Sequence, residues 1–233
     1  MPLAKEFKVI RYDVRGYGKS ALPNPEEPYS DYEDLKALLD HLNINKAHIC
    51  GLSMGSGIVV DFAIAYPDMC KSLIPVGPWA SGYGMNDFKS PAADSLFTVM
   101  ATVASIAREK GSKEATDYFL TGNRIFKNTI KSTKTLDLMK MVGYDYSFWG
   151  FINESKRQPL QPMAISQLDK IKTPTLIITA EYDLESCKEI AEIMEKEIAG
   201  SKKVSLEKAG HCMNMDKPDE FNEVLVKLIK NLE

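Results

Sequence analysis

Residues 46–65 read KAHICGLSMGSGIVVDFAIA, and this stretch decides the fold. The short apolar run 46–50 predicts a β-strand, and the glycine-rich run 51–57 predicts a tight turn. Apolar residues from Ile58 to Ala65 then recur at helical spacing until Pro67 ends the run. One continuous segment therefore carries the order strand, sharp turn, helix.

The turn contains a G-x-S-x-G motif, Gly51-Leu52-Ser53-Met54-Gly55. A serine on such a strained turn is exposed only if its near neighbours lack bulky side chains, which explains both Gly51 and Gly55. The N-terminus of the following helix directs backbone N–H groups and a positive dipole end at an oxyanion formed beside Ser53. In this setting the motif predicts a nucleophilic serine.

A serine nucleophile needs a base, and the chain has three histidines. His41 falls within a predicted helix, and His48 falls within the strand before the motif. His211 lies in the loop KAGHC at residues 208–212, directly after a predicted strand, and from there it can reach across the end of the sheet. We therefore expect His211 to be the base, the alternative being an exposed loop histidine without such a role.

The base needs an acid that fixes its tautomer. Asp183 and Glu181 both follow a predicted strand, in the run LIITAEYD at residues 176–183. Either carboxylate is a candidate for that acid, and a solvated loop carboxylate is the alternative for both.

Working outward from the motif, short β-prone runs alternate with amphipathic runs of helical spacing. Strands are expected at residues 8–13, 46–50, 72–76, 175–179 and 203–206, and helices at 31–42, 58–65, 186–198 and 219–231. This alternation predicts an α/β fold with a mainly parallel sheet.

Between residues 78 and 171 the alternation stops. This segment contains both tryptophans and predicts several helices broken by Gly111, Gly122 and Gly143. We expect a core formed by residues 1–77 and 172–233, with residues 78–171 inserted as a helical cap or lid.

The chain resembles the α/β-hydrolase superfamily in motifs along its length. They are the run VIRYDVRGYGKS at residues 9–20, the segment CGLSMG at 50–55, the acid strand at 176–183 and Gly210-His211. The helical insertion corresponds to the variable cap of that superfamily. Residues 48–55 are similar to the motif of enol-lactonases and related esterases, although Ser56 stands where that branch usually has glycine.

The resemblance implies the chain order nucleophile, acid, base, which Ser53, Asp183 and His211 follow, and we prefer Asp183 to Glu181 as the acid. It implies hydrolysis of a carboxylic ester or lactone through an acyl-enzyme on Ser53, with His211 as base and the Met54 N–H as one oxyanion donor. No cofactor or metal is expected. Two alternatives stay open: a catalytically silent or impaired binding protein or fragment, and a C–C bond hydrolase that uses the same residues.

One part of the superfamily pattern is absent. Before the strand expected at 8–13, the superfamily has a strand that ends in a His-Gly loop, and this sequence contains no His-Gly dipeptide. The absent strand would pair between the strands at 8–13 and 46–50, and its loop carries a second oxyanion donor, whose removal costs about 10²–10³ in turnover. We expect an N-terminally incomplete serine hydrolase, or a short one in which the two strands close together or a partner chain supplies the strand.

Composition argues against several other functions. The formal net charge of -3 gives no attraction to nucleic acid or to an anionic membrane. No apolar run approaches the roughly 20 residues that cross a bilayer, and no secretory signal is visible. The four cysteines form no C-x-x-C pair, which favours free thiols in a cytoplasmic protein over a zinc site. The expected partner is a small-molecule ester or lactone, and a homo-oligomer is left open.

Overall fold

The computed structural model describes residues 3–84, 92–153 and 156–232. Within them the sheet has four parallel strands in the order β1-β2-β3-β4. They are β1 (Ala47–Leu52), β2 (Cys70–Val76), β3 (Leu176–Tyr182) and β4 (Lys202–Gly210). The predicted α/β fold with a mainly parallel sheet is confirmed, and each of these strands overlaps a run predicted from the sequence.

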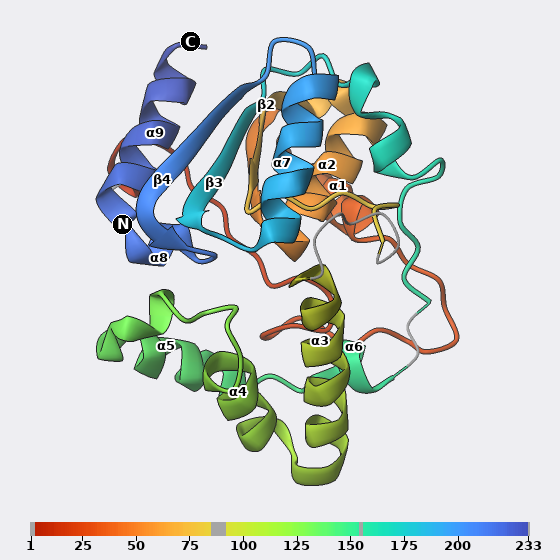
Figure 1. Ribbon diagram of the computed structural model, residues 1–233. Helices are drawn as coiled ribbons and strands as arrows, with labels where there is room; N and C mark the ends of the chain where they lie inside the picture. The colour runs from red at the N-terminus through yellow and green to blue at the C-terminus, as the bar shows by residue number, and fades with distance from the viewer. Residues whose placement is uncertain (1–2, 85–91, 154–155, 233) are drawn as a thin grey trace.

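Helices cover both faces of this sheet (Figure 1). One face carries α1 (Asp31–His41), α2 (Met54–Ala65) and α7 (Glu185–Glu197). The other carries α9 (Pro218–Lys230), preceded by the short α8 (Met213–Asp216). Strands covered on both faces need near-continuous apolar runs, and β2 is buried at every position except Lys71.

A separate group of helices stands opposite the ends of the strands to which the arrows of β3 and β4 point (Figure 1). It consists of α3 (Ala92–Lys110), α4 (Ser112–Thr121), α5 (Thr133–Tyr144) and α6 (Trp149–Ile152). The carboxyl ends of parallel strands are where open α/β sheets bind their ligands. The division into a core and a cap with boundaries at 78 and 171 stays a prediction. No described helix is long and apolar enough to cross a membrane.

The glycines of this group act in two ways. Gly111, with φ +92°, separates α3 from α4, and Gly122 ends α4, as the sequence predicts. The break predicted at Gly143 falls one residue later, because Gly143 is the penultimate residue of α5, which ends at Tyr144. A Cβ on Gly143 would lie 2.4 Å from a methyl carbon of Thr116, so this glycine lets α5 pack closely on α4.

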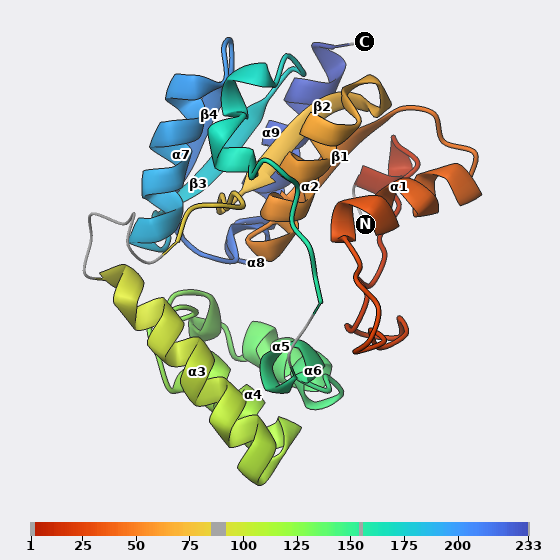
Figure 2. The same ribbon diagram turned by 90° about the vertical axis from the view of Figure 1, so that its right-hand side faces the viewer.

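The strand predicted at residues 8–13 is also wrong. Lys8–Asp13 belongs to no strand and is exposed, and Figure 2 shows this red part of the chain outside the sheet, near α1. A strand needs a neighbour for its backbone N–H and C=O groups, and no described strand lies beside this one. A groove of about 280 Å³, lined by Lys8, Ile10, Tyr12 and Val14 and by most of β1, separates the segment from the sheet. The two expected strands have therefore not closed together.

Candidate active site

Ser53 stands between β1 and α2, on the turn that the sequence predicts. Its backbone has φ 55° and ψ -112°, a conformation that costs a residue other than glycine on the order of 1–3 kcal/mol. Its N–H donates to the carbonyl of Val76 at 2.9 Å, and its own carbonyl accepts from the N–H of Ser56 at 2.9 Å. These bonds hold the strained turn, and Ser53 is partly exposed at the N-terminus of α2.

The two glycines of the motif differ in their surroundings. A Cβ on Gly51 would lie 2.1 Å from the carbonyl oxygen of Gly55, so Gly51 is required where β1 meets the first turn of α2. A Cβ on Gly55 would meet nothing within 4 Å. Gly51 is therefore crowded by the backbone of α2, whereas Gly55 borders the groove beside β1. That both glycines serve to expose Ser53 stays a prediction.

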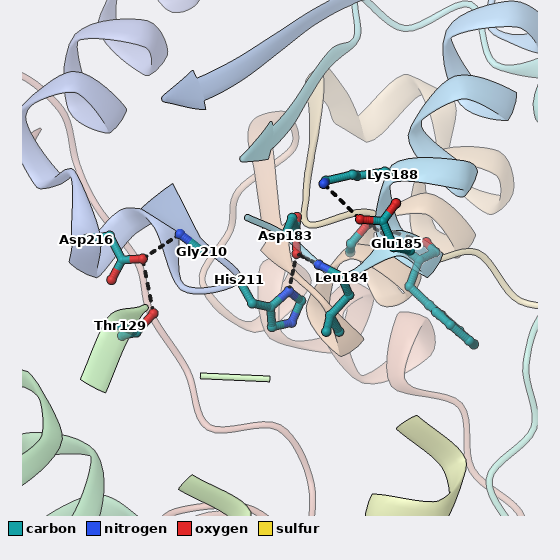
Figure 3. A network of polar contacts seen from close by, with 10 residues as sticks. Thr129, Asp183, Leu184, Glu185, Lys188, Gly210, His211 and Asp216 are labelled. Carbon is teal, nitrogen blue, oxygen red and sulfur yellow. Dashed lines mark hydrogen bonds and ion pairs between the residues drawn. The ribbon is translucent and has the colours of Figure 1, made fainter. Parts of the chain in front are cut away.

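Asp183 and His211 meet at the ends of β3 and β4 (Figure 3). Asp183 directly follows β3, and His211 directly follows β4. The His211 Nδ1 and Asp183 Oδ1 atoms are 2.7 Å apart, and the two side chains are 5% and 0% exposed. The N–H of Leu184 donates to the same Oδ1 at 2.8 Å. A carboxylate in this place holds the proton on Nδ1 and leaves Nε2 to accept one.

Gly77 brings this pair close to the serine. It follows Val76, whose carbonyl accepts from the Ser53 N–H, and its φ is +49°. A Cβ on Gly77 would lie 3.1 Å from an imidazole carbon of His211 and 3.4 Å from Asp183 Oδ2. The three predicted residues therefore gather at one end of the sheet. The contacts described for these residues include no hydrogen bond between Ser53 Oγ and His211.

No sequence pattern pointed to Asp216, which lies beside this pair. Its Oδ2 accepts from the Gly210 N–H at 2.7 Å and from the Thr129 hydroxyl at 3.1 Å (Figure 3). Gly210 precedes His211, and Thr129 belongs to the connection between α4 and α5. The one available signal, an acidic residue shortly after the Gly-His pair, is equally typical of the start of the next helix.

A pocket of about 440 Å³ opens beside Ser53 and Met54. Its walls are largely aromatic and apolar, with Trp79 from the loop after β2 and with Phe97 and Met100 from α3. A cavity of this size, mostly apolar with a few polar groups, is typical of a small-molecule site. Residues of α1, α2 and the loop after β2 therefore line the space beside Ser53 together with α3.

One end of the pocket carries charge. The Arg157 Nε atom forms an ion pair with Asp31, and Asp61 accepts from the Ser81 hydroxyl at 2.8 Å. Both carboxyl groups are buried, and this burial raises the pKa of Asp31 and of Asp61 above the ordinary value. The pocket thus combines apolar walls with one polar end whose residues come from distant segments of the chain.

Among the described residues, one group has metal-ligating atoms near each other: Asp183, Cys187 and His211, whose atoms lie within 4.8 Å. His211 Nδ1 is already bonded to Asp183. Burial raises the pKa of the Cys187 thiol well above its ordinary value, so the thiol keeps its proton, whereas metals bind the thiolate. The group fits a hydrogen-bonded acid and base better than a metal centre.

The competing residues lie elsewhere. His41 ends α1, and the Nδ1 atom of His48 within β1 is 2.8 Å from the Ser72 hydroxyl of β2. Glu181 accepts from the Lys208 backbone N–H at 2.8 Å. The structure therefore brings Asp183, and not Glu181, to the histidine.

Comparison with known proteins gives concordant results. The family described as alpha/beta hydrolase fold matches residues 2–218. The sequence is similar to 3-oxoadipate enol-lactonase 1 of Acinetobacter baylyi, with 23% identity over 99% of this chain and 82% of that protein. It is also similar to the proline iminopeptidase of Lactobacillus crispatus, with 28% identity over 94% of this chain and 79% of that protein. A solved hydrolase from Pseudomonas aeruginosa PA01 is similar in structure, with a TM-score of 0.76 and 26% identity over 97% of this chain and 81% of that one.

Proposed function

Because the chain belongs to the alpha/beta hydrolase fold family, we propose that it hydrolyses a carboxylic ester or a lactone through an acyl-enzyme on Ser53. A lactone is a cyclic ester, so the name of the Acinetobacter baylyi relative supports this type of bond. The proposed roles are nucleophile for Ser53, base for His211 and acid for Asp183.

One observation carries the proposal. Ser53 has a strained backbone at the N-terminus of α2, at the same end of the sheet as the buried pair of His211 and Asp183. Backbone strain at a residue other than glycine persists only where the surrounding structure holds it, and such residues gather at active sites. A buried carboxylate bonded to Nδ1 also keeps the imidazole in the tautomer that a general base needs.

In the first half of the reaction, Ser53 Oγ attacks the carbonyl carbon of the ester and its proton passes to His211 Nε2. The N–H of Met54, in the first turn of α2, donates to the resulting oxyanion. When the bond between the carbonyl carbon and the ester oxygen breaks, His211 returns the proton to that oxygen. In a lactone this leaving oxygen stays attached to the acyl group.

In the second half, His211 removes a proton from water, and the hydroxide attacks the acyl-enzyme. The proton then passes from His211 to Ser53 Oγ, which restores the enzyme and releases the acid. The aromatic pocket beside Ser53 and Met54 would hold an apolar part of the substrate.

A fluorophosphonate probe tests the proposal, because it labels a serine only when its hydroxyl is activated. We expect labelling of the wild type and none of Ser53→Ala. Ser166→Ala is the matched control, since Ser166 is exposed and lies in another part of the chain. Circular dichroism would establish that each variant is folded. Equal labelling of the wild type and Ser53→Ala would rule the proposal out.

A catalytically silent binding protein is the second candidate. The observation that favours it is that the described contacts leave Ser53 Oγ without a hydrogen bond to His211, the residue that would activate it. This candidate predicts tight binding of a ligand in the aromatic pocket, no ester turnover, and affinity unchanged by His211→Ala. Calorimetry of ligand binding, beside the labelling experiment, separates the two candidates.

A further inference from the structure

Asp216 contacts the residues on both sides of His211. Its side chain accepts a hydrogen bond from the N–H of Gly210 at 2.7 Å. Its own N–H donates to the carbonyl of Cys212 at 3.0 Å. His211 lies between these two neighbours, so one residue fixes the backbone before and after the imidazole.

The same carboxylate oxygen also reaches the helical group. Oδ2 accepts from the hydroxyl of Thr129 at 3.1 Å, and Thr129 precedes Asp216 by 87 positions. Thr129 is 1% exposed. Its neighbour Asn128 lies so close that a Cβ on Gly210 would be 2.9 Å from the Asn128 Cβ. The connection between α4 and α5 therefore rests on the loop that carries His211.

Apolar side chains also pack between the His211 loop and the connection between α4 and α5. The ring centroids of Phe126 and His211 are 6.4 Å apart. Phe126 and Cys212 belong to one buried cluster that also contains Leu120 and Ile125. The histidine loop is thus both packed and hydrogen-bonded to the helical group, and Asp216 bonds to each side. Thr129 also has a side-chain hydrogen bond to Cys212 of this loop.

We propose that Asp216 is a positioning residue for His211 and couples this base to the helical group through Thr129. The inference rests on the proposed function, because it assigns a catalytic consequence to the placement of His211. Asp216 acts through the loop backbone and not on the substrate. Loss of its carboxylate releases the Gly210 N–H and the Thr129 hydroxyl together, which lets the imidazole leave its alignment with Asp183.

Substitutions at Asp216 separate geometry from charge. Both side-chain bonds end on one oxygen, so Asp216→Asn can keep them through its amide carbonyl, whereas Asp216→Ala loses both. We expect kcat of Asp216→Ala to fall on the order of 10²-fold, the usual cost of a small misplacement of a catalytic group, with KM nearly unchanged. Asp216→Asn should recover most of that loss.

A spectroscopic readout avoids turnover altogether. The Nδ1 proton of His211 is buried and bonded to Asp183, so it should give a downfield proton resonance that exchanges slowly with water. The chain has three histidines, and His211→Ala assigns the signal. We expect the resonance to broaden or vanish in folded Asp216→Ala and to persist in Asp216→Asn.

Thr129→Val tests the link to the helical group, because it removes the hydroxyl and keeps the shape of the side chain. We expect a smaller fall in kcat than in Asp216→Ala, and no additional fall when the two changes are combined. Thr121→Val is the matched control, since the Thr121 hydroxyl donates to the Asp117 carbonyl of its own helix.

The outcomes distinguish the two proposals. A wild type that is labelled at Ser53, with kcat and the resonance unchanged in Asp216→Ala, overturns the positioning role and leaves the proposed function standing. An Asp216→Asn variant that matches Asp216→Ala in both readouts also overturns it, because the effect would then come from charge. A wild type without labelling overturns the proposed function, and the resonance still decides whether Asp216 positions the imidazole.

Discussion

Near the candidate site, the half of the sheet that contains β3 and β4 differs from the half that contains β1. At β3 and β4, Asp183 and His211 are buried, and hydrogen bonds join their loops to neighbouring elements. At β1, Cys50 is exposed and a groove of about 280 Å³ runs along the strand. In the described sheet β1 and β4 are both edge strands. The proposed acid and base are held by buried hydrogen bonds beyond their strands, whereas Ser53 follows a strand that borders a groove.

Removal of the Asp183 carboxylate tests the buried pair at the ends of β3 and β4, and it has the largest expected effect. In Asp183→Asn we expect turnover to fall on the order of 10⁴-fold, because an amide favours the wrong tautomer of the imidazole. Steady-state kinetics with an ester that the wild type cleaves would measure it. Glu181→Gln is the matched control on the same strand and should keep near-wild-type turnover. Equal losses in both variants would contradict the assignment of Asp183 as the acid.

Side-chain packing should also differ between β3 and the segment beside the groove at β1. Ile177 in β3 is 0% exposed, and Ile177→Ala should lower the free energy of unfolding by about 2–5 kcal/mol. Ile10, which is 39% exposed beside the groove, should change it by less than about 0.5 kcal/mol when replaced by alanine. Urea denaturation followed by circular dichroism would measure both. A cost of several kcal/mol for Ile10→Ala would mean that the groove is closed in solution.

Substitutions at Gly51 and Gly55 test the packing where β1 meets α2. Gly51→Ala places a methyl group 2.1 Å from the carbonyl oxygen of Gly55, and we expect a loss of about 1–3 kcal/mol in the free energy of unfolding. Gly55→Ala points into open space within a helix, so we expect a gain of up to about 1 kcal/mol. Thermal and urea unfolding of both variants would measure the contrast. A destabilised Gly55→Ala would show that something occupies the groove.

The smallest expected effect concerns Glu181 and pH. The Lys208 backbone N–H, and next the Tyr182 hydroxyl, lower the pKa of Glu181 below its ordinary value of 4.5. A carboxylate with a lowered folded-state pKa contributes stability above its unfolded-state pKa, and this contribution is lost as pH falls through the folded-state value. Glu181→Gln should therefore unfold slightly more easily than the wild type at pH 7, and the difference should vanish in acid. A difference that grows on acidification would contradict this sign.

Sequence patterns predicted those parts of the fold that depend on local order. The run from β1 to α2 carries its alternation, its glycines and its helical spacing within one segment, so its structure and the place of Ser53 were both predictable. The run at residues 8–13 has equally good local features and forms no strand, because pairing depends on a neighbour and not on the run itself. A local sequence pattern therefore predicts a strand reliably only where a neighbouring strand is present to pair with it.

The candidate site likewise contains residues that sequence patterns indicate and residues that they do not. Ser53 and His211 could be picked out because each follows a predicted strand, and the strands of a parallel sheet end at the same edge. Asp183 is preferred to Glu181 only through the family resemblance. Asp216 and Thr129 meet across 87 positions of sequence, through one carboxylate oxygen that carries no pattern of its own. The ion pair of Arg157 with Asp31 in the pocket is a second example. Contacts of this kind arise from packing and become visible only in three dimensions.

The missing side chain of Gly77 decides how freely the imidazole of His211 can turn. The N–H of Gly77 is fixed to the Ile178 carbonyl at 2.9 Å, and the imidazole lies against the face where a Cβ would project. The ring of Phe126 lies on the helical side. Gly77 and Phe126 therefore both restrict the imidazole, and in the proposed reaction less reorientation of the ring would precede each proton transfer.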